Sequence, residues 1–139
     1  MLKGISPLLS PELLKVLAEM GHGDEIVFGD ANFPASNCAK RLVRYDGHSV
    51  SGLLSAILPL FPIDCNAGQH AIVMRTEDGI APPVWSDYMK IILSFEPTVQ
   101  LSQLPRQEFY DRAKEAYAIV ATGERALYGN LILCKGVCK

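Results

Sequence analysis

The stretch that decides the fold reads Met20-Gly21-His22-Gly23-Asp24-Glu25-Ile26-Val27-Phe28-Gly29-Asp30-Ala31-Asn32-Phe33-Pro34. A helical pattern stops at its first glycine, a histidine follows between two glycines, and a short apolar run leads to Gly29-Asp30. This order predicts helix, tight loop, strand and loop, and the glycines allow sharp turns and the close approach of a ligand. It places one imidazole and several carboxylates on loops at the ends of a buried strand, where catalytic groups commonly lie.

Helical and strand patterns alternate along the rest of the chain. The segment Ser10-Pro11-Glu12 opens the first helix, because it offers a capping serine, a first-turn proline and an acidic residue that complements the helix dipole. Apolar periodicity predicts the other elements: helices over 50–58, 85–92 and 106–120, strands over 26–28, 41–45, 71–74, 99–101 and 130–133, and loops over 31–40 and 77–83. The alternation predicts one α/β domain over residues 1–139, a three-layer α/β/α arrangement with a mixed, largely parallel sheet.

Composition and charge narrow the class of protein. The net charge is −2 and no basic cluster stands out, which argues against nucleic acid as a partner. No apolar run is long enough to span a bilayer, and no apolar segment of a signal peptide follows Lys3. The four cysteines show no CxxC spacing and are expected to be free thiols rather than zinc ligands; they are Cys38, Cys65, Cys134 and Cys138. We therefore expect a soluble cytoplasmic domain that binds neither membrane nor metal.

His22 is the first candidate catalytic residue. Histidine titrates near neutrality and is the natural proton carrier at physiological pH. Between two glycines it is expected to be presented to a ligand rather than packed in the core. The alternative is a surface histidine at a helix C-terminus, where a cation is mildly favoured. His48 and His70 lie beside turn residues without a comparable setting.

The carboxylates near His22 form the second group of candidates. Asp30 follows a predicted strand, and this is the ligand-facing end in α/β sheets, so a functional role is favoured. Asp24 or Glu25 would orient the imidazole or hold a sugar hydroxyl. The alternative for both is plain solvation at the end of a helix, and for Glu25 that interpretation is preferred.

The segment from Thr122 to Asn130 is a polar loop before a buried strand. Tyr128 and Asn130 offer a hydroxyl and an amide, both suited to neutral polyhydroxyl ligands. The alternative is a turn that needs Gly129 and Asn130 for backbone reasons alone. Arg106 stands at a predicted helix start, where the dipole disfavours a cation, so it is either functional or a solvated side chain.

No motif for nucleotide, metal or covalent serine chemistry is present. The chain lacks GxGxxG after a strand, a P-loop, HExxH and a nucleophile elbow. The remaining candidates indicate proton transfer to, or binding of, a neutral small molecule, without a cofactor.

Several of these segments together resemble the L-fucose mutarotases of the wider ribose-pyranase-like family. The matching stretches are Leu9–Ile26, Asp30, Asn32-Phe33-Pro34, Arg44–Gly47, Glu108–Lys114 and Ala121–Leu133. The resemblance spans nearly the whole chain and is least clear over residues 62–100. It implies interconversion of the α and β anomers of L-fucose without a cofactor or metal.

The resemblance also assigns roles to single residues. His22 matches the family's proton donor, while Asp30, Arg106 and the run Tyr128-Gly129-Asn130 match its sugar-binding positions. The ribose-acting branch carries histidine where Arg106 stands here, so the arginine favours L-fucose. Trp85 is expected to pack against the apolar face or the methyl group of the sugar.

Assembly follows from the same resemblance. It implies a ring-like homo-oligomer, a decamer, with each site at a subunit boundary. We expect Tyr128 and Asn130 to come from the subunit adjacent to the one that supplies His22 and Asp30. Two alternatives stay open: a mutarotase or pyranase for another sugar such as ribose, and a sugar-binding module without turnover.

Overall fold

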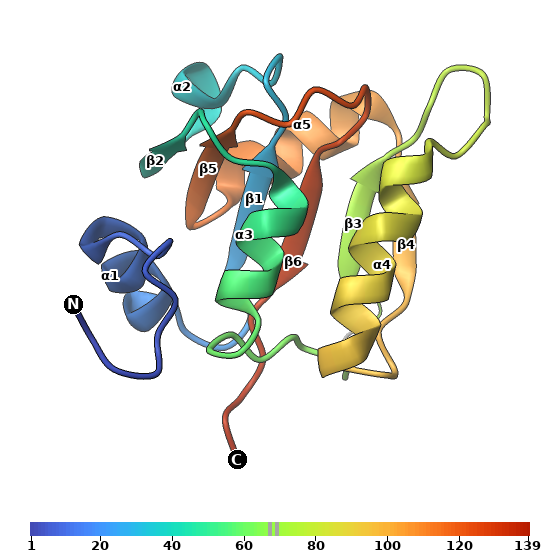
Figure 1. Ribbon diagram of the computed structural model, residues 1–139. Coiled ribbons are helices and arrows are strands. Elements are labelled where there is room, and N and C mark those ends of the chain that lie inside the picture. The colour runs from blue at the N-terminus through green and yellow to red at the C-terminus, as the bar shows by residue number, and fades with distance from the viewer. Residues whose placement is uncertain (67, 69) are drawn as a thin grey trace.

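Six strands and five helices make up the computed structural model, which describes residues 1–66, 68 and 70–139 (Figure 1). The strands are β1 Glu25–Gly29, β2 Leu42–Tyr45, β3 Ala71–Met74, β4 Leu101–Leu104, β5 Ala118–Thr122 and β6 Leu131–Cys134. The helices are α1 Pro11–Glu19, α2 Ala35–Cys38, α3 Val50–Ile57, α4 Pro83–Phe95 and α5 Arg106–Glu115.

All six strands belong to one sheet with the order β2-β5-β1-β6-β3-β4. β1 pairs parallel with β5, β5 with β2, and β3 with β4, while β6 runs antiparallel to both of its neighbours. The predicted mixed, largely parallel sheet is therefore confirmed. Strands β1 to β5 all end at one edge of the sheet, where β6 begins, and we call this the carboxyl edge. The opposite edge, where β6 ends, is the amino edge.

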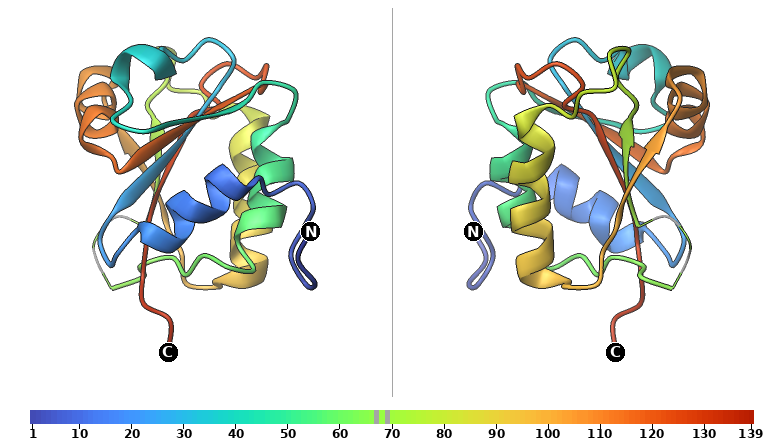
Figure 2. Two further views of the ribbon diagram at one scale, coloured as in Figure 1. Left: turned by 90° about the vertical axis from the view of Figure 1, so that its left-hand side faces the viewer. Right: turned by 90° about the vertical axis from the view of Figure 1, so that its right-hand side faces the viewer.

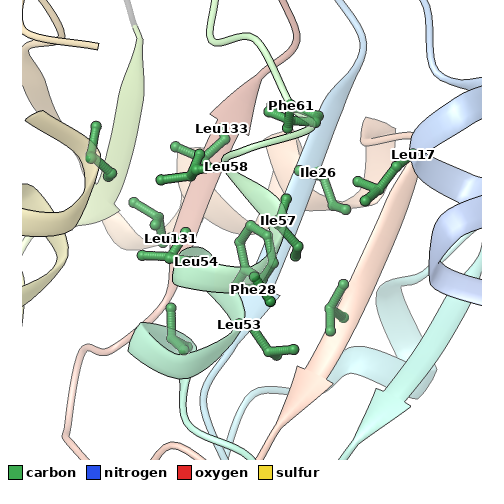
Figure 3. Close-up of a cluster of buried hydrophobic side chains, with 14 of the residues drawn as sticks. Leu17, Ile26, Phe28, Leu53, Leu54, Ile57, Leu58, Phe61, Leu131 and Leu133 are labelled. Carbon is green, nitrogen blue, oxygen red and sulfur yellow. The ribbon is translucent and has the colours of Figure 1, made fainter. Parts of the chain in front are cut away.

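Helices cover both faces of the sheet, as the three-layer prediction requires (Figure 2). One core contains side chains of α1, α3 and α4, and the other contains side chains of α2 and α5. In β1, Ile26 and Phe28 enter the first core (Figure 3). Val27, between them, enters the second core. Strands buried on both faces read as continuous apolar runs, which explains why the short run in the opening stretch marks the centre of the sheet.

Helix α1 forms as its sequence predicts and sets the position of the loop that follows. The Ser10 hydroxyl accepts a hydrogen bond from the Leu13 backbone N–H at 3.1 Å. At the other end, the Lys135 ammonium donates to the backbone carbonyls of Leu17 and Met20. A cation that binds the last carbonyls stabilises a helix C-terminus. These contacts fix the point at which the chain leaves α1 for His22.

Strand β5 is the main difference from the sequence prediction, which extended a helix from 106 to 120. Helix α5 ends at Glu115, and Ala118–Thr122 forms a fully buried strand between β1 and β2. The prediction failed because Phe109, Ala113 and Ala116 keep helical spacing up to the break. The β-branched pair Ile119-Val120 was the contrary signal. Smaller differences are the helix α2 inside the expected loop 31–40, and β4, which lies at 101–104 instead of 99–101.

Two other expectations concern thiols and membrane spans. The four cysteines are free, as their spacing predicted. In the part of the chain that the structure describes, no helix has the combination of length and apolar character needed to cross a bilayer.

Candidate functional site

A cavity of about 340 Å³ opens at the carboxyl edge of the sheet. Its walls come from the loops after β1, β3 and β4 and from the turn before β6. The residues that line it are Asp30, Asn32, Phe33, Met74, Glu77, Arg106, Tyr110, Leu127, Tyr128 and Asn130. The structure thus brings together Asp30, Arg106, Tyr128 and Asn130, which the sequence had singled out over a span of a hundred residues.

Asp30 and Asn130 lie side by side in the cavity, because Asp30 follows β1, Asn130 precedes β6, and these two strands are neighbours in the sheet. The Asp30 backbone N–H donates to Oδ1 of Asn130 at 2.7 Å, and the Asn32 N–H donates to Oδ1 of Asp30 at 2.9 Å. Both side chains are buried. Burial raises the pKa of the Asp30 carboxyl above its ordinary value, although the Asn32 backbone N–H opposes the shift. A carboxyl pKa raised by burial is a common feature of groups that act as acids or bases in active sites.

The turn before β6 holds Tyr128 and Gly129 in a constrained backbone. Tyr128 has a φ of 57°, in the left-handed region that an aromatic residue rarely adopts. A Cβ atom on Gly129 would lie 2.9 Å from the Ala126 carbonyl oxygen and 3.0 Å from Cγ of Glu124. Gly129 therefore has a backbone role in this turn, and the same turn places Tyr128 and Asn130 on the cavity.

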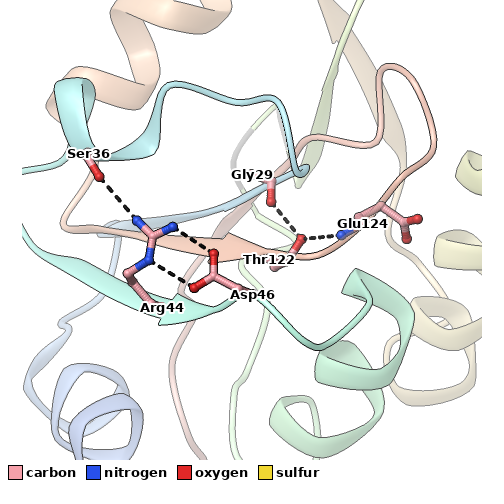
Figure 4. A network of polar contacts seen from close by, with 6 residues as sticks. All are labelled: Gly29, Ser36, Arg44, Asp46, Thr122 and Glu124. Atoms are coloured by element: carbon pink, nitrogen blue, oxygen red, sulfur yellow. Dashed lines mark hydrogen bonds and ion pairs between the residues drawn. The ribbon is translucent and has the colours of Figure 1, made fainter.

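A hydrogen-bond network ties the loop after β1 to the loop after β5 (Figure 4). The Thr122 hydroxyl donates to the Gly29 carbonyl at 2.7 Å and accepts from the Glu124 N–H at 3.2 Å. The Ala31 N–H donates to the Glu124 carbonyl at 2.7 Å. These bonds fix the backbone on both sides of Asp30.

Arg106 is the first residue of α5, and its guanidinium lies at the mouth of the cavity. The side chain is 64% exposed, and its nearest nitrogen is 3.6 Å from Oε1 of Glu77, which follows β3. Apolar groups form the neighbouring wall, where the rings of Phe33 and Tyr110 stack with centroids 5.6 Å apart. The cavity therefore combines a cation, hydroxyl and amide groups and an aromatic surface.

Trp85 does not line this cavity, and the expectation that it packs against a sugar is corrected. Its side chain is only 4% exposed, in the first turn of α4. The indole Nε1–H donates to the Tyr128 backbone carbonyl at 2.8 Å. Trp85 therefore contacts the turn that lines the cavity from behind.

His22 lies at the amino edge, far from Asp30. Strand β1 separates them, and its four steps from Glu25 to Gly29 span about 13 Å at roughly 3.3 Å per residue. The expectation that one subunit supplies His22 and Asp30 to a site, and its neighbour supplies Asn130, was wrong. Asp30 and Asn130 of one chain lie together in the cavity, and His22 of that chain lies away from it. The imidazole is 60% exposed, and its Nε2 is 3.2 Å from Oδ2 of Asp64.

The carboxylates expected beside His22 have other partners. Oδ2 of Asp24 accepts from the Gly21 N–H at 2.7 Å, which closes the loop. Glu25 forms a bidentate pair with Arg112 at 2.8 and 2.9 Å and so is not simply solvated. Asp64, which the sequence gave no reason to select, is the group that faces the imidazole.

Sequence reasoning also missed Glu77 and Tyr110 in the cavity wall. Glu77 lies in a loop without periodicity, so no sequence signal marks it. Tyr110 follows Arg106 by one helical turn, and that spacing was the usable signal. His70, by contrast, is buried, and its Nδ1 accepts from the Gln100 N–H at 3.1 Å, so its role is structural. Among the described residues, no three His, Cys, Asp or Glu side chains gather as a metal site.

Comparison with known proteins gives consistent matches over the whole chain. The model of the RbsD / FucU transport protein family matches residues 3–138. A fucose mutarotase from Streptococcus pneumoniae, solved in complex with L-fucose, is 45% identical, with a TM-score of 0.93 and coverage of 99% of this chain and 100% of that chain. FucU from Bifidobacterium longum is 44% identical, with the same TM-score and the same coverage. RbsD from Bacillus subtilis, complexed with D-ribose, is 25% identical, with a TM-score of 0.74 and full coverage of both chains.

Proposed function

Since the chain belongs to the RbsD / FucU transport protein family, we propose that it is an L-fucose mutarotase. It is an isomerase that interconverts the α and β anomers of L-fucose by opening and closing the sugar ring. The observation that carries the proposal is the cavity itself, in which Asp30, Arg106, Tyr128 and Asn130 converge. A relative that shares nearly half of this sequence over its full length is a fucose mutarotase in complex with L-fucose.

The groups in the cavity suit this chemistry. A cyclic hemiacetal opens when the anomeric hydroxyl loses a proton and the ring oxygen gains one, and the aldehyde then recloses on its other face. Proton carriers are required, and redox groups are not. Positioned acid–base groups accelerate such steps by roughly 10²–10⁴-fold. Asp30, whose pKa burial raises, is one such group in the cavity.

The size and polarity of the cavity support a monosaccharide substrate. About 340 Å³ lies within the range of about 300–1,000 Å³ for small-molecule sites. In our proposal Arg106, Tyr128 and Asn130 bind the sugar hydroxyls, and Gly129 shapes the turn that presents them. The stacked rings of Phe33 and Tyr110 offer an apolar surface for the sugar methyl group.

We propose that His22 reaches the cavity of a second copy of the chain and serves there as the proton donor. Within one chain β1 separates His22 from the cavity, and the imidazole is exposed at the amino edge. A homo-oligomer with shared sites, of which a ring-like decamer is the form we propose, brings the two edges together. The free thiols support the proposal that the protein acts in a reducing compartment, the cytoplasm.

The test is saturation-transfer NMR on purified, chelator-treated protein with L-fucose and D-ribose. This measurement follows exchange between anomers at equilibrium, where no net product forms. We expect faster exchange for L-fucose than for D-ribose, and much slower exchange with the His22→Ala variant than with the wild type. Faster exchange for D-ribose would favour the pyranase alternative. Binding without exchange would favour the sugar-binding module, and exchange at the buffer rate with folded protein would refute the mutarotase proposal.

A further inference from the structure

Two aromatic side chains of α4 hold the backbone of the Tyr128–Asn130 turn from behind. The Trp85 Nε1–H donates to the Tyr128 carbonyl at 2.8 Å, and the Tyr88 hydroxyl donates to the Gly129 carbonyl at 2.8 Å. Trp85 and Tyr88 are three residues apart, so they lie on one face of the helix. They bind two consecutive carbonyls just before β6 begins at Leu131.

The donors are fixed in the core and are not free to follow the turn. Tyr88 is fully buried and Trp85 is 4% exposed. Oε1 of Glu124 is 3.4 Å from the Tyr88 oxygen, and its Oε2 accepts from the Ala126 N–H at 3.3 Å. Burial, with the Glu124 charge beside it, raises the pKa of Tyr88, so the hydroxyl keeps its proton and stays a donor.

The turn needs this support because its backbone is unfavourable on its own. Tyr128 has a φ of 57°, which costs an aromatic residue free energy unless the surroundings enforce it. Gly129 fits only without a Cβ atom, which would lie 3.1 Å from the Tyr88 oxygen. The position of the turn decides where the Tyr128 hydroxyl and the Asn130 amide lie in the cavity.

We propose that Trp85 and Tyr88 are positioning residues for sugar binding, which act by holding the Tyr128–Asn130 turn in its binding geometry. They do not touch the sugar. The inference rests on the proposed function and deepens it, since it assigns the geometry of the sugar-binding turn to a helix outside the cavity. It also gives Trp85, which was expected to contact the sugar, a role in the site without such a contact.

The test compares Tyr88→Phe with the matched variant Tyr45→Phe. Tyr45 is also buried, and its hydroxyl donates to the Leu8 carbonyl at 3.0 Å and accepts from the Ser10 N–H at 2.7 Å, in the segment before α1 rather than at the cavity. Both variants lose one buried hydroxyl that binds a backbone carbonyl, so both should lose similar stability in urea titrations. Only Tyr88→Phe should raise KM for L-fucose, by about tenfold, with kcat little changed, because Tyr128 and Asn130 bind ground state and transition state alike.

A purely structural role predicts a different result. Partial unfolding lowers the amount of active protein and therefore kcat, while KM stays at the wild-type value. Equal KM values for folded Tyr88→Phe and Tyr45→Phe would overturn the proposal. If Tyr88→Phe does not fold, Trp85→Phe carries the same test, because it removes the Nε1–H and keeps an aromatic ring.

A second readout separates this inference from the proposed function. The Asp30 N–H, bonded to Oδ1 of Asn130, reports the position of the turn without any sugar. Its hydrogen exchange with solvent should be faster in Tyr88→Phe than in Tyr45→Phe. If wild-type protein shows no anomer exchange, the mutarotase proposal fails, and this measurement still decides whether α4 positions the turn. Equal exchange in the two variants would overturn the inference.

Discussion

The two edges of the sheet carry different halves of the chemistry. The carboxyl edge has a cavity with a buried carboxyl group, a guanidinium, a hydroxyl and an amide. The amino edge has an exposed imidazole paired with the buried Asp64 carboxylate. At the carboxyl edge Asp30 and Asn130 are joined by a hydrogen bond of 2.7 Å, whereas His22 lies on a glycine-flanked loop and its imidazole is exposed.

Because the two edges lie apart, the complete site in our proposal needs groups from two copies of the chain. Parallel strands gather their carboxyl ends at one edge, so any residue that precedes β1 is directed to the other edge. No change of side-chain rotamer bridges a strand of about 13 Å. Substitutions at one edge or the other therefore test both the proposed function and the proposed assembly.

The largest effect is expected for His22→Ala. Loss of the proton donor should lower kcat/KM for anomer exchange by about 10²–10⁴-fold, as read by saturation-transfer NMR. The imidazole is 60% exposed, so the free energy of unfolding should change by less than about 1 kcal/mol. Full activity in His22→Gln, together with unfolding of His22→Ala, would mean that the histidine is structural.

The next effect concerns the carboxyl edge, where Asp30→Asn should lower kcat/KM by about 10²-fold. The same substitution should lower activity but increase stability at neutral pH. The pKa of Asp30 is raised in the folded state, so the folded protein binds this proton more tightly than the unfolded chain does. The carboxylate therefore costs stability as pH rises through the unfolded and then the folded pKa.

The asparagine variant removes that cost. The free energy of unfolding of the variant minus that of the wild type, measured in urea, should be larger at pH 7 than at pH 4. If this difference instead decreases from pH 4 to pH 7, the folded protein stabilises the carboxylate, contrary to the burial argument.

Complementation joins the two edges in one experiment. At sugar concentrations well below KM, the His22→Ala and Asn130→Ala proteins should each be nearly inactive. After dissociation, mixing and reassembly, about one quarter of random subunit boundaries would pair a native His22 with a native Asn130. Activity should rise about 25-fold over a parent that retains about one hundredth of wild-type activity. No recovery in oligomers shown to be mixed would mean that each site lies within one chain.

The sequence predicts the parts of the fold and site that depend on local pattern. Continuous apolar runs marked β1, β3 and β6, and Ser10-Pro11 marked the start of α1. Asp30 was found because it follows a strand, and Arg106 because it opposes the helix dipole. The one strand lost, β5, lies behind a helix whose spacing continues up to its break, so local periodicity masked it.

The rest depends on tertiary contacts that local pattern does not encode. Trp85 reads as an amphipathic helix residue, and only the three-dimensional arrangement shows its bond to the turn before β6. His22 and Asp30 are close in sequence but lie at opposite edges, because the strand between them is extended. Asp64 pairs with His22 across 42 residues, and no short-range rule links the two.

A smaller effect is expected for Gly129→Ala, compared with Gly47→Ala. At Gly129 a Cβ atom would meet the Ala126 carbonyl oxygen at 2.9 Å, while at Gly47 no atom lies within 4 Å. The first variant should lose about 1–3 kcal/mol of unfolding free energy in urea titrations. It should also raise KM for L-fucose, because the turn must shift, whereas Gly47→Ala should match the wild type in KM. Equal stability and KM in the two variants would show that the turn yields freely.

The smallest effect is expected for Glu77→Gln, with Glu115→Gln as its control. Both glutamates are 81% exposed and pair with a cation, Glu77 with Arg106 at 3.6 Å and Glu115 with Lys40 at 3.4 Å. Exposed pairs contribute about 0–1 kcal/mol, so neither variant should differ measurably from the wild type in urea titrations.

Only Glu77 lines the cavity, and its loss frees the Arg106 guanidinium to move over the sugar site. We expect KM for L-fucose to change by a few-fold in Glu77→Gln, with a smaller change at high salt, because salt screens exposed charges over about 8–10 Å. Glu115→Gln should leave KM unchanged at any salt concentration. A change of equal size in the two variants would assign the effect to net charge, and Arg106 would then hold its place at the mouth of the cavity without Glu77.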